Sequence, residues 1–167
     1  MPMQKLLIIY AFLFTTIVSA ETLKLSFGGK QKISNVIEFP NNTGMMFNWT
    51  SENTFTSNTH LFGSSICSGA MRLGGDGQIQ SQYIVCEATS QNGFKVWLLF
   101  DDPGGDITAE VNPFKVTNGT GPWKETIGAK CLGALRTVYN EDYYLFDASC
   151  NLTKASYDRI NNFEYKK

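Results

Sequence analysis

The stretch VTNGTGPWKETIGAKCLGALRTVYNEDYYLFDASC, residues 116–150, decides the fold of this chain. It reads as a glycine-rich loop, a strand, a tight turn and a returning strand, with one cysteine on each strand. An earlier segment repeats the hairpin with the same cysteine spacing. Two such hairpins indicate an exported all-β protein held together by disulfides.

The spacing of the four cysteines predicts how they pair in disulfides. Cys67 and Cys86 are separated by nineteen positions, and so are Cys131 and Cys150. Residues that face each other in an antiparallel hairpin are symmetric about its turn. The two midpoints fall inside GGDGQ and YNED, which are typical turn sequences. We therefore predict the disulfides Cys67–Cys86 and Cys131–Cys150, each stabilising the fold by roughly 3 kcal/mol in the chain-entropy model.

Residues 1–20 have the pattern of a secretory signal peptide. Lys5 precedes an apolar run over residues 6–18, and Val18-Ser19-Ala20 places small residues where a signal peptidase cuts. The run is shorter than the ~20 residues of a membrane span, which disfavours an anchor. We expect cleavage before Glu21, a single all-β barrel domain over residues 21–167, and a secreted protein, periplasmic if the source is a Gram-negative bacterium.

Charge and composition exclude some classes of partner. The chain has 14 basic and 15 acidic residues, and loss of Lys5 leaves 13 − 15 = −2. No basic field is present to attract nucleic acid or an anionic membrane surface. Asn, Thr, Ser and Gly supply most of the polarity, which is typical of strands and turns rather than surface helices.

Alternation of apolar and polar residues recurs along the whole chain. It predicts strands over residues 22–27, 33–39 and 45–50, with a break at Gly28-Gly29. Residues 51–65, rich in Ser, Thr and Asn, are expected to form a long loop or a short edge strand. The fold class predicted is all-β, a closed antiparallel barrel of about eight strands, with a two-sheet sandwich as the alternative.

One strand, residues 94–100, is apolar on both faces. A barrel strand has a single inward face, so Trp97 and Leu99 need a cover outside the barrel. A second subunit would supply it through self-association, and so would the C-terminal tail with Phe163 and Tyr165. The pattern of residues 154–167 fits a short helix or an irregular strand equally well.

The loop NGTGPW at residues 118–123, with Gly128 five residues later, resembles a loop of the dirigent and allene-oxide-cyclase-like barrels. This superfamily has GGTG-x-aromatic followed by a glycine and two closing strands. The matching residues are Gly119, Thr120, Gly121, Trp123 and Gly128. Asn118 and Pro122 depart from the pattern. The resemblance spans residues 67–151 and implies a closed barrel, often a trimer in plants, that binds or guides a small ligand. It carries no catalytic residue onto this chain.

The sequence contains no recognisable catalytic or metal-binding pattern. The only histidine, His60, lies in a polar segment, and the cysteines are taken up by the predicted disulfides. No zinc spacing, phosphate-binding loop or dinucleotide fingerprint occurs. We therefore assign no catalytic residue, no metal and no cofactor, and favour a protein that is not an enzyme.

Four Asn-x-Thr sequons occur, at Asn41, Asn48, Asn118 and Asn151. In a eukaryotic source they are candidate glycosylation sites, and the alternation around Asn48 places that side chain outward.

The sequence leaves three functions open. The first is a non-catalytic secreted barrel that binds a small apolar or aromatic ligand or guides its coupling. The second is an extracellular structural or protein-interaction module with a filled barrel. The third is a cyclase or isomerase type of enzyme. The volume of the barrel interior separates the first two hypotheses.

Overall fold

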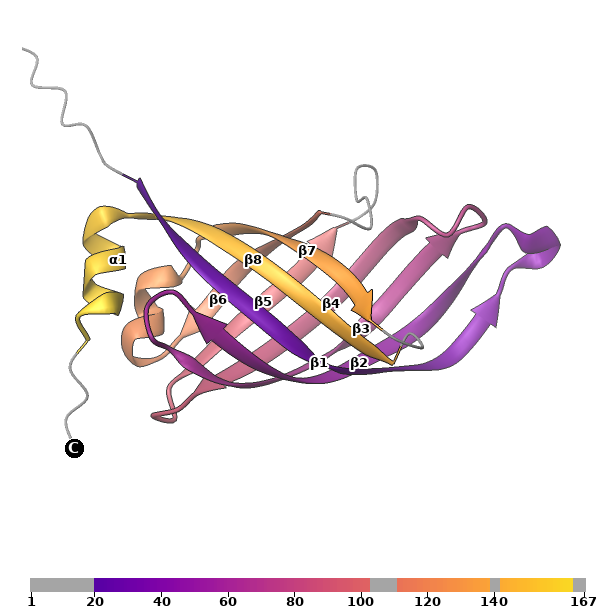
Figure 1. The fold of residues 1–167 in the computed structure, drawn as a ribbon. Coiled ribbons are helices and arrows are strands. Elements are labelled where there is room, and N and C mark those ends of the chain that lie inside the picture. The colour runs from indigo at the N-terminus through magenta and orange to yellow at the C-terminus, as the bar shows by residue number, and fades with distance from the viewer. Residues whose placement is uncertain (1–19, 103–110, 139–141, 164–167) are drawn as a thin grey trace, which may run out of the picture.

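The chain forms a closed antiparallel barrel of eight strands in sequence order, so the predicted fold class is confirmed and the sandwich is not formed (Figure 1). The computed structural model describes residues 20–102, 111–138 and 142–163. Its elements are β1 (Ala20–Glu38), η1 (Pro40–Asn42), β2 (Gly44–Ser57), β3 (Phe62–Gly74), β4 (Ile79–Ser90), β5 (Lys95–Asp102), β6 (Asn112–Gly119), η2 (Gly121–Thr126), β7 (Lys130–Val138), β8 (Tyr143–Thr153) and α1 (Lys154–Asn161). The predicted signal peptide lies outside the described residues except for its last residue, Ala20.

Both disulfides join the two strands of one hairpin, as the turn symmetry predicts. Cys67 on β3 lies opposite Cys86 on β4, and Cys131 on β7 lies opposite Cys150 on β8. The Cα separations are 4.0 Å and 4.3 Å. All four cysteines are buried, so the two disulfides form part of the barrel interior.

Strand β1 is longer than the sequence predicts, because Gly28-Gly29 does not interrupt it. The strand runs from Ala20 to Glu38 and pairs with β2 on one edge and β8 on the other. At Gly29 a Cβ atom would lie 2.1 Å from the carbonyl oxygen of Glu52 and 2.5 Å from Asn53 Oδ1. The glycine is therefore required by the close approach of β2, and the predicted break is wrong.

The loop or short edge strand expected over residues 51–65 is also wrong. Strand β2 continues to Ser57 and β3 begins at Phe62, which leaves only a tight turn. His60 lies in this turn with φ at 63°. The pattern is misleading because Ser51 and Asn53 face inward, where alternation normally shows apolar residues.

One end of the barrel is closed. The Trp123 side chain from η2 is fully buried, and its ring centroid lies 5.9 Å from that of Phe55. Helix α1 packs on η2, β1 and β8 and buries Ile160. Thr153 accepts a hydrogen bond from the Ser156 backbone N–H at 3.1 Å, which caps the N-terminus of α1. Of the two conformations left open for the tail, residues 154–161 adopt the helix.

The opposite end is extended, and none of the described residues caps it. Pairing of β1 with β8 stops at Lys30, whereas pairing of β1 with β2 continues to Glu38. The sheet of β1 to β4 therefore projects beyond the rest of the barrel (Figure 1). No helix in the described part of the chain is long and apolar enough to cross a membrane.

The close approach at Gly29 yields a test. We expect Gly29→Ala to lower the free energy of unfolding by about 1–3 kcal/mol or more, because the new Cβ meets backbone atoms that cannot move aside. Gly28→Ala is the matched control, since its Cβ would meet only the ends of the Tyr143 and Leu145 side chains, at 3.1 Å and 3.2 Å. Urea denaturation measures both, and equal losses would contradict the role given to Gly29.

Candidate functional site

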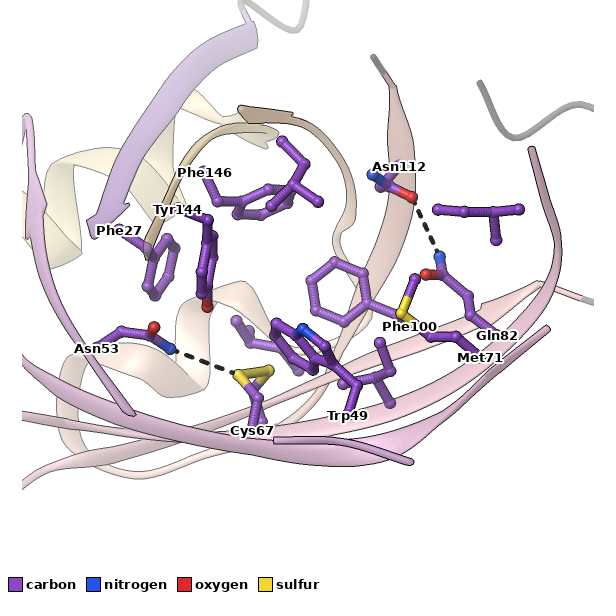
Figure 2. Close-up of a pocket in the computed structure, with 15 residues that line it drawn as sticks. Phe27, Trp49, Asn53, Cys67, Met71, Gln82, Phe100, Asn112, Tyr144 and Phe146 are labelled. Carbon is purple, nitrogen blue, oxygen red and sulfur yellow. Dashed lines mark hydrogen bonds between the residues drawn. A yellow bond between two sulfur atoms is a disulfide. The ribbon is translucent and has the colours of Figure 1, made fainter. Parts of the chain in front are cut away.

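A cavity of about 60 Å³ lies inside the barrel, on the side toward the projecting strands (Figure 2). Its volume is several times the ~15 Å³ that one water needs, and well below the ~150 Å³ of a cavity that binds benzene. It is lined by Phe27, Trp49, Asn53, Cys67, Met71, Ile79, Gln82, Ile84, Cys86, Leu98, Phe100, Asn112, Leu135, Tyr144 and Phe146. The interior therefore has room for more than a water or two.

Aromatic rings form most of one wall of this cavity. Phe100 stacks on Phe114 with centroids 4.9 Å apart, and both rings contact Phe146. The ring of Trp49 lies 5.6 Å from that of Tyr144. Packed rings of this kind give a rigid apolar surface that suits a flat or apolar molecule.

A cluster of four polar side chains lies at the cavity wall, and two of them, Asn53 and Tyr144, are part of the lining. Asn53 Nδ2 donates to Ser51 Oγ and to Ser65 Oγ, each at 3.1 Å. The Tyr144 hydroxyl shares a hydrogen bond of 3.0 Å with Ser51 Oγ. These side chains are buried, and they come from β2, β3 and β8. The cluster brings together residues that are 93 positions apart in sequence.

Asn53 Oδ1 is buried and has no hydrogen-bond partner. Figure 2 shows the Asn53 amide and the Tyr144 hydroxyl on the same side of the cavity. The Asn53 amide fits here because Gly29 has no side chain, and a Cβ atom at position 29 would lie 2.5 Å from Asn53 Oδ1. An unpaired buried carbonyl costs roughly 1–3 kcal/mol, so its presence needs a reason.

A second pair of polar side chains also lines the cavity. Gln82 Nε2 donates to Asn112 Oδ1 at 3.3 Å, and both residues are buried. Met71 and Ile79 lie nearby in the lining. Methionine is unbranched and adapts its shape, so Met71 is the side chain best suited to yield to an occupant.

Burial raises the pKa of the Tyr144 hydroxyl above its ordinary value, although hydrogen bonds to Ser51 and Asn53 act in the opposite direction. Desolvation is the larger effect because it disfavours the phenolate inside the apolar barrel. The Tyr144 hydroxyl is thus neutral at neutral pH and available as a hydrogen-bond donor or acceptor.

The site residues predicted from the sequence lie in different parts of the barrel. Cys67 and Cys86 line the cavity, whereas Cys131 and Cys150 lie deeper in the core. The residues of the family-like loop form the closed end of the barrel instead: Gly119, Thr120, Gly121, Trp123 and Gly128. Gly121 and Gly128 have φ of 55° and 80°, which favours glycine at both positions.

Two carboxylates on the strands, Asp147 and Glu87, face outward. Asp147 on β8 pairs with Arg136, and Glu87 on β4 pairs with Lys95. The hydrogen bond from Lys95 holds the pKa of the Glu87 carboxyl below its ordinary value. Neither carboxylate lines the cavity. In the part of the chain that is described, no group of three or more His, Cys, Asp or Glu side chains could hold a metal ion.

The predicted apolar outer face is present on β3, β4 and β5. Trp97 and Leu99 are half-buried, and the Trp97 indole N–H donates to Glu87 Oε2 at 3.1 Å. Ile66, Tyr83 and Val85 lie on the same face and are 65%, 57% and 40% exposed. We name these five residues the outer apolar patch.

The described tail lies at the closed end of the barrel. Phe163 packs edge-on against Phe94, with ring centroids 5.5 Å apart. Tyr165 lies outside the described residues.

The four sequon asparagines are all exposed. Asn41 is in η1 at the tip of the projecting hairpin, and Asn48 and Asn151 are on the outer faces of β2 and β8. Asn118 pairs directly with Trp97 across β5 and β6. Their exposure is compatible with glycosylation at each position.

All four residues of the polar cluster were missed in the sequence. Ser51, Asn53 and Ser65 fell in the segment expected to be a loop, and Tyr144 was not distinguished from the adjacent Tyr143. Only the register of β8 places Tyr144 inward and Tyr143 outward. The one usable signal was the period-two spacing of Trp49, Ser51 and Asn53.

No protein-family model matches the sequence, and no curated protein matches it by sequence. Solved structures do share its fold. A conserved protein of unknown function from Rhodopseudomonas palustris matches with a TM-score of 0.56 and 11% identity, over 80% of this chain and 99% of that one. A pterocarpan synthase dirigent protein matches with a TM-score of 0.50 and 10% identity, over 81% and 92%. The barrel is therefore similar to a dirigent protein in fold.

The buried Tyr144 hydroxyl predicts a pH dependence of stability. Its pKa is raised in the folded state, so the unfolded chain loses this proton first as the pH rises. The stabilisation is complete below the ordinary tyrosine pKa of about 10 and is lost as the pH rises through the folded value. We expect the free energy of unfolding to fall as the pH rises from about 10 to the folded value, and Tyr144→Phe to remove part of the fall.

Urea denaturation at several alkaline pH values measures this effect. Tyr83→Phe is the matched control, because Tyr83 is on the exposed outer face and its replacement leaves the buried hydroxyl in place. A Tyr144→Phe variant with the same alkaline slope as the native chain would contradict the assignment.

Proposed function

We propose that this protein is a secreted barrel of the dirigent and allene-oxide-cyclase-like superfamily that binds a small apolar or aromatic molecule in its interior. The observation that carries the proposal is the apolar, aromatic-lined cavity with a buried polar cluster in its wall. Ligand sites are commonly apolar concavities with a few placed polar groups, and the mouth of a barrel is a frequent location.

The cavity lining favours binding and orientation over chemistry. It provides flat rings, flexible methionine and neutral hydrogen-bonding groups. Such a surface can hold a reactive molecule in one orientation and so guide its coupling without a catalytic residue of the protein. A cyclase or isomerase remains the third candidate, and no residue is proposed for its chemistry.

The size of the cavity sets a condition on the ligand. At about 60 Å³ it is smaller than a benzene-sized space, so an aromatic ligand needs Met71 and Phe100 to move. Both side chains are only partly buried, unlike the core rings behind them. The proposal therefore includes an expansion of the cavity on binding.

Secretion is supported by the sequence and by the disulfides. Residues 1–20 have the signal-peptide pattern, and two buried disulfides are typical of oxidising compartments. Under this proposal residues 21–167 are the mature domain. The four exposed sequons are its candidate glycosylation sites in a eukaryotic host.

The second candidate, an extracellular interaction module, is favoured by the outer apolar patch. Its five side chains lie on neighbouring strands of a rigid sheet. We propose that a second copy of this chain covers the patch, because Trp97 and Leu99 alternate with core residues and the described tail packs at the end of the barrel instead. Self-association and ligand binding use opposite faces of the sheet and are compatible.

Ligand binding can be tested by blocking the cavity. We expect small fluorinated aromatics to bind the mature protein, as seen by ligand-observed ¹⁹F NMR. Leu135→Trp should weaken binding about tenfold or more, because Leu135 lines the cavity and the larger ring occupies it. Leu132→Trp, on the exposed face of the same strand, should leave binding unchanged. No binding by the native chain would leave the interaction module as the favoured function.

Self-association can be tested by sedimentation of the mature chain produced without glycans. We expect an oligomer at micromolar concentration that Trp97→Ser converts to a monomer, since Trp97 supplies the largest ring of the outer apolar patch. Leu132→Ser removes an exposed apolar residue outside the patch and should leave the oligomer intact. A monomeric native chain would end the proposal.

A further inference from the structure

The polar cluster has an unused acceptor beside the cavity. Asn53 is buried, and its Nδ2 donates to Ser51 Oγ, Ser65 Oγ and Cys67 Sγ, whereas its Oδ1 accepts no hydrogen bond. The acceptor capacity of the Asn53 amide is therefore unused among the described residues.

The same cluster has an unused donor. Ser51 and Tyr144 each carry one hydroxyl proton, but a single hydrogen bond of 3.0 Å joins them. Only one of these two protons can lie in that bond, so the other is available to an acceptor outside the Ser51–Tyr144 pair. The wall of the cavity thus offers one donor and one acceptor within the same group of side chains.

The charge of the described cavity lining limits which ligands can bind there. The side chains that line the cavity, as far as the chain is described, include no Asp, Glu, Lys, Arg or His. A carboxylate or phosphate brought into this space would have no described counter-charge and would lie near the Asn53 carbonyl. Burial of an uncompensated ion is far more costly than burial of a neutral polar group.

We propose that Asn53 and Tyr144, held in place by Ser51, anchor a neutral ligand through a group that both donates and accepts a hydrogen bond, such as a hydroxyl or a primary amide. The apolar body of the ligand then lies against Trp49 and the neighbouring rings (Figure 2). This inference rests on the proposed ligand binding and adds the chemical class of the ligand. A hydroxyl satisfies both unused atoms at once, which an anion or a hydrocarbon cannot do.

The test compares three probes of similar size by ¹⁹F NMR on the mature, disulfide-intact protein. These are 4-fluorophenol, 4-fluorotoluene and 4-fluorobenzoate, at a pH where the phenol is neutral. We expect the phenol to bind about tenfold more tightly than the toluene, which corresponds to one buried hydrogen bond. The benzoate should bind more weakly than both.

Two variants test whether the preference for phenol over toluene arises at Asn53. Asn53→Leu keeps the branching of the side chain and should reduce the preference for phenol to about onefold. Ile84→Val also changes the cavity lining but removes no hydrogen-bonding group, and it should keep the preference. If Asn53→Leu does not fold, Tyr144→Phe serves in its place and should lower the preference for phenol in the same direction.

The outcomes separate this inference from the function on which it rests. Equal binding of phenol and toluene, or tighter binding of benzoate, would overturn the anchor and leave ligand binding in place. A phenol preference that survives Asn53→Leu would also overturn it, since the hydroxyl is then recognised elsewhere. If no probe binds, the cavity holds only water and the proposed function itself fails.

Discussion

Closure of the barrel depends on β1, which forms hydrogen-bonded ladders on both of its edges. Such a strand must run straight past two neighbours without a side chain in the way. Gly29 meets this requirement, because the Glu52 carbonyl and the Asn53 side chain occupy the space where its Cβ would lie. The first strand thereby joins the last, and no edge is left open along the barrel itself. The space at Gly29 also decides where the Asn53 amide lies, so closure and the polar cluster share one structural cause.

The two ends of the barrel follow from the lengths of the strands. At one end, η2 brings Trp123 into the interior and α1 covers it, which fills that half with side chains. At the other end β1 to β4 extend beyond β5 to β8, so fewer of the described strands contribute side chains to the interior there. The cavity lies in this less crowded half, with Cys67–Cys86 in its wall and Cys131–Cys150 in the filled half. A disulfide in each hairpin constrains the unfolded chain on both sides of the molecule.

Local patterns predicted the parts of this structure that local chemistry determines. The hairpin turns and cysteine symmetry identify both disulfides, and alternation identifies an all-β barrel. Features that depend on contacts between strands far apart in sequence could not be predicted from local patterns. A glycine pair normally ends a strand, and only the approach of β2 explains why Gly28-Gly29 does not. Ser51 and Asn53 look like loop residues until β3 and β8 place Ser65 and Tyr144 beside them.

The polar cluster is difficult to explain as a contribution to stability. An aromatic interior with a leucine at position 53 would bury no unpaired carbonyl, and the surrounding rings could pack against it directly. The cluster instead retains an amide and three hydroxyls whose hydrogen bonds do not close among themselves. Departures of this kind from the best packing are expected where a protein contacts something other than itself. The incomplete hydrogen bonding at Asn53 therefore supports the proposal that a small molecule binds in this half of the barrel.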